Sequence, residues 1–247
     1  MNCKMRTLNF AKRNFKELIR DPLGIIFALI LPLFLLFIFQ QFDIPNKSYE
    51  LENFTPGIIV FAFSFITMFT SMLISKDRSS SLLIRLAISP MKGSEYILGY
   101  MISLIPVILI QNILFFILAI ALGLNFTFNI IWTILVSLFI SILFISIGII
   151  IGSVSSEKAS SGISSIIVQL VCFTSGMYFP EEMLGKTFGM ICEYLPFESC
   201  LTILKGIMNN NLEIITVRNV AVFISYAIVA FATAVIVFKN KMISDDK

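Results

Sequence analysis

The sequence predicts an all-α integral membrane protein with six transmembrane helices. Hydrophobic residues make up 57% of the chain, charged residues only 13%, and the mean hydropathy is +0.94. A soluble domain is about half apolar and a quarter charged. Apolar runs of about 20 residues, the length that crosses a bilayer, recur along all 247 residues. We therefore expect residues 1–247 to form a single transmembrane domain.

Residues 1–21 predict an amphipathic helix in the headgroup layer of the membrane. At 100° per residue, apolar and charged side chains fall on opposite faces. The apolar face holds Leu8, Ala11, Phe15, Leu18 and Ile19, and the charged face holds Arg13, Lys16, Glu17 and Arg20. We expect the basic residues to face anionic lipid. A signal peptide is disfavoured because the charged part is too long and no small-residue cleavage site follows.

Six apolar segments are long enough to be the spans. They cover residues 23–42, 56–75, 96–122, 130–152, 162–179 and 219–238. Pro32 lies inside the first segment, and proline frees backbone groups that neighbouring helices must then satisfy. The sequence therefore predicts a kink buried in the bundle.

The connections differ in character. Residues 76–95 are charged, with a short apolar cluster, and residues 153–161 form a tight loop. The longest connection, residues 180–218, predicts two short half-apolar helices broken at Leu195 and Pro196, each too short to cross the membrane. Small residues recur every four positions, a spacing that favours close helix packing. They are Gly148, Gly152, Ser156, Ser160 and Ser164, and packing within the chain is favoured over a dimer contact.

The distribution of basic residues predicts the orientation. With both termini and residues 76–95 and 153–161 in the cytoplasm, that side carries 14 of the 18 Lys and Arg residues. This topology satisfies the positive-inside rule.

The interiors of the six spans contain no Asp, Glu, Lys, Arg or His. Carriers driven by proton or sodium gradients usually need such groups, so energy for any transport is expected from outside this chain. The nearest string to a phosphate-binding loop is PEEMLGKT, Pro180 to Thr187. Pro180 replaces the first glycine of that motif, and no βαβ unit surrounds it, so a nucleotide site is not expected.

Three stretches resemble the permease subunits of type-2 ABC exporters. The first is FKELIRDPLGIIFALILP at Phe15 to Pro32, which is similar to the family's interfacial helix, Arg-Asp-Pro step and first span. The second is DRSSSLLIRLAISP at Asp77 to Pro90, and the third is SGMYFPEEMLGKTFGMICEYLPFESCLTILKG at Ser175 to Gly206. Asp77 and Ser81 stand where the family pattern has glutamate and glycine.

The resemblance implies a cytoplasmic coupling helix at Leu82 to Ile88 that contacts an ATP-binding subunit. The residues expected to make this contact are Asp77, Arg78, Leu82, Leu83, Arg85, Leu86, Ile88 and Pro90. From the residues alone, the apolar cluster framed by basic side chains suits a protein partner or the membrane surface equally.

The resemblance also implies re-entrant helices that cap the substrate path on the outer side. The expected cap residues are Phe179, Pro180, Glu181, Glu182, Leu195 and Pro196. Glu181, Glu182, Glu193 and Glu198 are interpreted as a solvated face, with an influence on release of a cationic product as the sharper hypothesis. A disulfide between Cys192 and Cys200 remains open. Gln111, Asn112 and Gln169 are candidates for the substrate path, although hydrogen bonding between helices is the favoured role.

The predicted function is therefore the permease subunit of an ABC exporter in a bacterial cell membrane, moving a drug, antimicrobial peptide or lipid-like molecule. The expected partners are two ATPase subunits, a second or sister permease, and membrane lipid, with no nucleic acid. No cofactor is expected in this chain, because ATP and Mg²⁺ would bind the ATPase. The alternatives are a polysaccharide or lipid-linked glycan exporter, a membrane-embedded enzyme, and an immunity or sensor protein.

Overall fold

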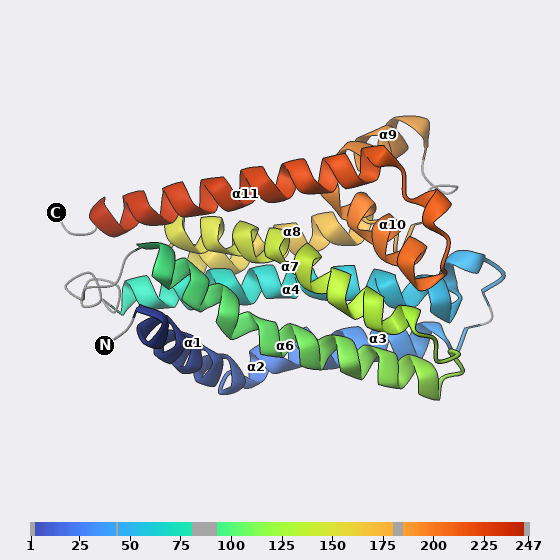
Figure 1. Ribbon diagram of the computed structural model, residues 1–247, viewed down its shortest axis with the longest axis horizontal. Coiled ribbons are helices and arrows are strands. Elements are labelled where there is room, and N and C mark those ends of the chain that lie inside the picture. Colours follow the sequence, from blue (N-terminus) through green and yellow to red (C-terminus); the bar gives the residue numbers. More distant parts are fainter. Residues whose placement is uncertain (1–2, 43, 81–92, 180–184, 245–247) are drawn as a thin grey trace.

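The computed structural model describes residues 3–42, 44–80, 93–179 and 185–244. These residues form an elongated bundle of helices, and no β-strand occurs among them. Helix α1 (Cys3–Ile19), the end of α4 (Leu51–Ser79), the start of α6 (Gly93–Ala121) and the end of α11 (Val217–Ser244) all lie at one end of the bundle (Figure 1). Helices α9 (Lys186–Tyr194) and α10 (Pro196–Met208) lie at the other end. All-α architecture is thus confirmed for the described residues.

Helix α1 packs on the bundle through a different face from the one its amphipathic pattern predicts. Leu8 and Ile19, assigned to the apolar face, are exposed, whereas Phe10 and Asn14 are buried. Phe10 makes edge contacts with the rings of Tyr96 and Tyr100 of α6, at centroid distances of 5.3 and 5.0 Å. The face of α1 that packs on the bundle shares Ala11, which is 3% exposed, with the predicted apolar face, and the position of α1 in the headgroup layer stays a prediction.

The first apolar segment is helical but irregular. It consists of α2 (Pro22–Ile25), the π-helical turn η1 (Ile26–Ile30) and α3 (Leu31–Phe39). Pro32 has no N–H to donate to the carbonyl of Ala28, four residues earlier. Gln111 of α6 supplies the missing bond, its Nε2 donating to the Ala28 oxygen at 2.6 Å. The expectation that a neighbouring helix compensates for this proline is confirmed.

Helix α4 is the centre of the bundle, with 89% of its most apolar window buried. It packs against α7 (Asn129–Val154) and α8 (Glu157–Thr174). A Cβ at Gly148 or Gly152 of α7 would lie 2.6 Å from a backbone oxygen of α4, so only glycine permits this approach. The small-residue repeat therefore serves packing inside the chain, as expected.

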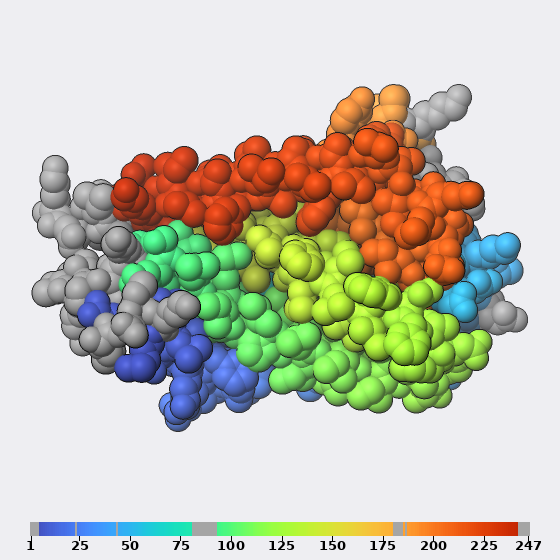
Figure 2. Space-filling model, viewed as in Figure 1, coloured from blue at the N-terminus to red at the C-terminus, as the bar shows by residue number. Residues whose placement is uncertain are grey.

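Among the described residues, four helices are long and apolar enough to cross a membrane: α4, α6, α7 and α11. The shorter apolar helix of residues 26–39 and α8 do not reach that length and apolarity, so the six-span arrangement stays a prediction. Helix α11 lies along one side of the bundle, with much of its surface exposed (Figure 2). Its exposed side chains are largely apolar, which suits contact with lipid.

Several boundaries differ from the sequence prediction; α4, for example, begins at Leu51 and not at residue 56. Helix α8 begins at Glu157 and not at residue 162, because Ser156 caps it by accepting a bond from the Ala159 N–H. It ends at Thr174, five residues before the expected 179, and Gly176 follows with φ of +76°, a conformation that favours glycine. Phe179 therefore lies beyond the helix, although its ring still stacks on Phe173 at 5.6 Å.

The connection between α8 and α11 contains the two predicted short helices, α9 and α10, separated at Leu195 with Pro196 at the start of α10. Proline suits this position because the first turn of a helix needs no N–H donor there. Helix α10 is largely buried against α4, α7 and α11. Short helical turns η2 (Lys47–Tyr49) and η4 (Leu212–Ile214) complete the described elements at this end.

Candidate functional site

Asp77, in the last turn of α4, is the centre of a charged cluster. Its side chain is only 1% exposed. Arg13 of α1 donates to both carboxylate oxygens, from Nη2 to Oδ1 at 2.7 Å and from Nη1 to Oδ2 at 2.8 Å. The Tyr100 hydroxyl of α6 donates to Oδ2 at 2.7 Å. One carboxylate thus joins three helices, through the two-pronged geometry that arginine provides.

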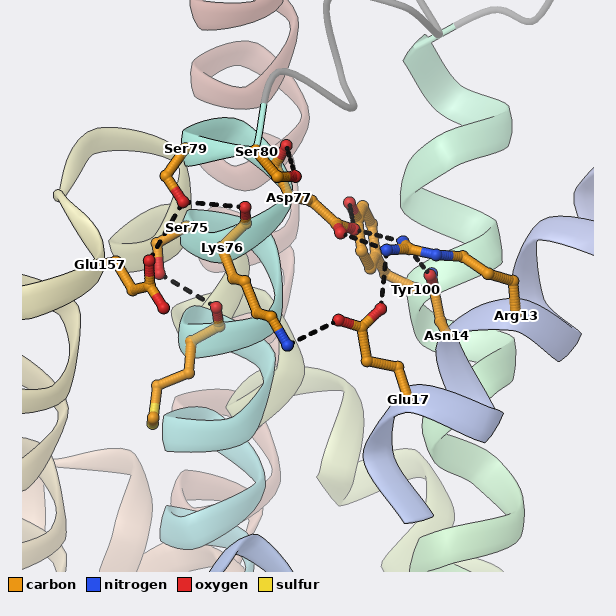
Figure 3. Close-up of polar contacts among 11 residues, drawn as sticks. Arg13, Asn14, Glu17, Ser75, Lys76, Asp77, Ser79, Ser80, Tyr100 and Glu157 are labelled. Atoms are coloured by element: carbon orange, nitrogen blue, oxygen red, sulfur yellow. Dashed lines mark hydrogen bonds and ion pairs between the residues drawn. The ribbon is translucent and has the colours of Figure 1, made fainter. Parts of the chain in front are cut away.

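A second carboxylate extends the cluster along α1. Glu17 accepts from Arg13 at 2.7 Å and from Lys76 of α4 at 2.9 Å. Asn14 is buried beside Arg13 and accepts a bond from its Nη1 at 2.9 Å. Figure 3 shows these side chains converging between α1, α4 and α6. In the following text the Asp77 cluster means Arg13, Asn14, Glu17, Lys76, Asp77 and Tyr100.

Arg78 and Ser79 connect the same end of α4 to the hairpin between α7 and α8. The Arg78 Nη1 donates to the carbonyls of Gly152 and Ser155 at 3.4 and 3.3 Å. A cation at these carbonyls complements the negative end of α7. The Ser79 hydroxyl donates to Glu157 at 3.1 Å. The last turn of α4 is therefore fixed to four helices: α1, α6, α7 and α8.

The electrostatics favour the charged form of Arg13. Burial of the Arg13 guanidinium would lower its pKa, but the hydrogen bond and negative charge of Asp77 outweigh burial and raise it. A buried ionised carboxylate needs such compensation, because an isolated charge in a low-dielectric interior is very unfavourable. The cluster joins α1, α4 and α6 through these bonds.

The cluster sits at the base of residues 81–92. Helix α4 ends at Ser79 and α6 begins at Gly93, and the cluster bonds these two flanking helices to each other and to α1. Of the residues expected to contact an ATPase, Asp77 and Arg78 are described here. The other six lie outside the described residues: Leu82, Leu83, Arg85, Leu86, Ile88 and Pro90.

Sequence reasoning missed Arg13, Glu17 and Tyr100 as members of this site. It assigned Arg13 and Glu17 to a lipid-facing surface, whereas both point toward α4 (Figure 3). The available signal was Asp77 itself, an acid between Lys76 and Arg78 at the end of a long, largely apolar helix. Such an acid needs a partner, but no spacing in the sequence identifies a partner that is 64 residues away.

Two of the three candidate path residues are fully buried inside this chain. Gln111 bonds to Ala28, and the Asn112 Nδ2 donates to the Ser137 hydroxyl of α7 at 2.7 Å. Gln169 of α8 is exposed. The structure brings Gln111 and Asn112 into contacts between helices and leaves Gln169 on the surface of the chain.

The end of the bundle that carries α9 and α10 includes both buried and exposed candidate residues. Leu195 is partly buried and Pro196 is buried, whereas Pro180, Glu181 and Glu182 lie outside the described residues. Glu193 forms an exposed ion pair with Arg218, but Glu198 is only 6% exposed, so it is not part of a solvated face as expected. Cys192 and Cys200 are buried and are not joined by a disulfide, and burial raises the pKa of the Cys200 thiol. Within the described residues, no group of three His, Cys, Asp or Glu could hold a metal.

The family model for ABC-2 type transporters matches residues 6–209. This match covers most of the chain, including α1, the Asp77 cluster and α10, and it shows that the protein belongs to the ABC-2 type transporter family. The chain is therefore a membrane-embedded permease component of an ABC transporter. Such a component works with ATP-binding subunits. Among curated proteins, none matches the chain.

Proposed function

We propose that this protein is the membrane subunit of an ABC exporter whose separate ATPase subunits act on residues 81–92. Two ATPase subunits and a second permease, identical or sister, would complete the transporter, in a bacterial cell membrane with both termini in the cytoplasm. The cargo would be a hydrophobic or amphipathic compound, such as a drug, an antimicrobial peptide or a lipid-like molecule.

The Asp77 cluster is the observation that carries this proposal. A force applied to residues 81–92 passes first to the end of α4 and the start of α6. Because Asp77 bonds to Tyr100 and Arg13, these two helix ends and α1 would move as one body. Arg78 extends the connection to the end of α7. A rigid connection of this kind suits the transfer of movement from a soluble motor into a bundle.

The interior of the bundle supports an external energy source. The contacts between helices there are neutral hydrogen bonds, as between Thr67 and the Phe144 carbonyl at 2.9 Å and between Ser71 and Ser164 at 2.6 Å. Gradient-driven carriers instead place ionisable groups near the middle of the membrane. ATP hydrolysis in a partner subunit supplies the energy without such groups.

Co-purification and ATPase measurements test the proposal. Replacing Leu82, Leu83 and Leu86 by aspartate should abolish ATPase binding, because these residues form the apolar face of the proposed coupling helix. Phe126→Asp is the matched control, an exposed apolar residue at the opposite end of the bundle. If the triple variant binds its ATPase and stimulates hydrolysis as the unaltered protein does, the proposed contact is wrong.

Direction and cargo need a transport assay. Inside-out vesicles that contain the permease and its ATPase should accumulate a fluorescent amphipathic compound when ATP is added. Arg13→Gln should reduce accumulation while ATPase binding persists, because it loosens α1 and leaves residues 81–92 unchanged. Accumulation by right-side-out vesicles with ATP inside would instead indicate import.

A further inference from the structure

A basic groove lies between α1 and α4, beside the Asp77 cluster. It has a volume of about 870 Å³, and α1 contributes one wall while Phe69, Met72 and Leu73 of α4 form an apolar floor. Three exposed cations of α1, Lys12, Lys16 and Arg20, line it. The groove is therefore charged at its wall and apolar at its base.

The positive charges of Lys12, Lys16 and Arg20 are poorly compensated by nearby negative charges. They lie four residues apart on one edge of α1, and like charges at this spacing repel each other. The acids of the groove are engaged elsewhere: Glu17 with Arg13 and Lys76, and Glu157 with Ser79. Asp21 bonds to the Gly24 N–H at the start of the first apolar segment. An anion bound beside Lys12, Lys16 and Arg20 would relieve this repulsion.

An apolar slot continues the groove toward the membrane interior. The slot, about 110 Å³, lies between η1 with its flanking turns and α6, and it is walled by Ala28, Leu104 and Val107. Groove and slot share Leu18, Asp21 and Phe69 as lining residues, so they adjoin. This slot is smaller than the dry cavity of about 150 Å³ that accommodates benzene, so it has room for only a few methylene groups of one hydrocarbon chain.

We propose that groove and slot together form a binding site for one anionic phospholipid. Lys12, Lys16 and Arg20 hold its phosphate, and one acyl chain enters the slot between η1 and α6. The chemistry of both parts matches this ligand. The cations lie near Asp21, where the polypeptide is proposed to enter the membrane, and the apolar slot continues from there toward the membrane interior. The bound lipid lies against α1, Phe69 and α6, so it stabilises the packing of the same helices that the Asp77 cluster joins. The site depends neither on the cargo nor on the direction of transport.

Native mass spectrometry of the purified permease with added lipid tests the site. Phosphatidylglycerol should bind, and phosphatidylcholine should bind much more weakly. Each lysine near an anionic surface strengthens binding by a factor of about five. Lys12→Gln with Lys16→Gln should therefore weaken phosphatidylglycerol binding about 25-fold. Lys12→Arg with Lys16→Arg should keep it.

Lys239→Gln with Lys241→Gln is the matched control. Both residues are exposed cations near the same end of the bundle, on α11 and outside the groove. This control should leave lipid binding unchanged. Equal loss in both double variants would mean that only general attraction to basic residues is measured, and would overturn the proposal.

A slot variant separates a lipid from a free anion. Val107→Phe should fill the slot and weaken binding of phosphatidylglycerol but not of glycerol phosphate. Equal affinity of the unaltered protein for these two ligands would overturn the proposal, since the acyl chain would then contribute nothing. The proposal also fails if the lysine variants bind lipid normally but lose the ATPase subunit or the dimer mass. The groove would then belong to a protein partner or to a second copy.

Discussion

The carboxyl end and the middle of α4 illustrate two ways of holding helices together in a membrane protein. At its carboxyl end, charged side chains join α4 to α1 and α6 through Asp77. In its middle, α4 meets α7 and α8 through glycine contacts and neutral hydroxyls. Charges concentrate at the end because Arg13 and Lys76 keep contact with water there, with side chains 37% and 57% exposed.

The difference follows from the cost of removing charge from water. A buried ion pair gains little over an apolar contact, but removing one partner leaves an uncompensated charge. Neutral hydrogen bonds between membrane helices are individually weak, about 0.6 kcal/mol on average. We therefore expect the charged end to respond strongly to single substitutions and the interior to respond mainly to changes in shape.

The largest effect is expected at the Asp77 cluster. Arg13→Gln should lower the free energy of unfolding by about 2–3 kcal/mol, because it leaves the Asp77 carboxylate buried with only Tyr100 as its partner. The partial exposure of Arg13 keeps the loss below that of a fully buried pair. Chemical unfolding in detergent measures it. Arg13→Gln combined with Asp77→Asn should recover part of the loss, and simple additivity of the two changes would contradict the assigned pairing.

Close helix packing in the interior should give the next largest effect. Gly152→Ala places a Cβ 2.6 Å from the Ser71 carbonyl oxygen and should cost about 1–3 kcal/mol by overpacking. Gly162→Ala on α8 is the matched control, since nothing lies within 4 Å of its Cβ position. This control should stabilise its helix by up to about 1 kcal/mol. Thermal unfolding of both variants checks the prediction, and equal behaviour would contradict the contact between α7 and α4.

Substitution of Gln111 should cause the third largest loss in the free energy of unfolding. A second substitution, at Pro32, tests whether this loss depends on the proline. Gln111→Leu removes the donor to the Ala28 carbonyl and should cost about 1–2 kcal/mol, the cost of an unsatisfied buried acceptor. In a Pro32→Ala background the same change should cost less, because the new N–H can satisfy Ala28. Gln169→Leu, at an exposed site, serves as the control. An unchanged cost in the Pro32→Ala background would show that Gln111 acts independently of the proline.

The smallest effect is expected for a single neutral bond. Thr67→Val keeps the shape of the side chain and removes its bond to the Phe144 carbonyl, so a loss near 0.6 kcal/mol is expected. The same unfolding assay measures it. A loss as large as that of Arg13→Gln would remove the distinction between the two ways of joining helices.

Much of the fold could be predicted from the sequence, because its signals are local. Hydrophobic length predicted α4, α6, α7 and α11, proline predicted both the irregular first segment and the break at Leu195, and the glycine repeat predicted the packing of α7. The site was predictable only in part. Asp77 and Arg78 were assigned to a contact with an ATPase, which stays a prediction, and the contacts of Arg13 and Tyr100 depend on how α1 and α6 lie against α4.

What the sequence by itself determined is the class of molecule: a helical membrane protein whose spans are uncharged inside and whose basic residues concentrate at one end. Composition and segment length decide this because the bilayer acts on each residue separately. Only the tertiary structure decided that Arg13 pairs with Asp77 and that Gln111 donates a hydrogen bond to the Ala28 carbonyl. Both contacts join residues that are far apart in the sequence. Hydrophobic periodicity carries no information about contacts of this kind.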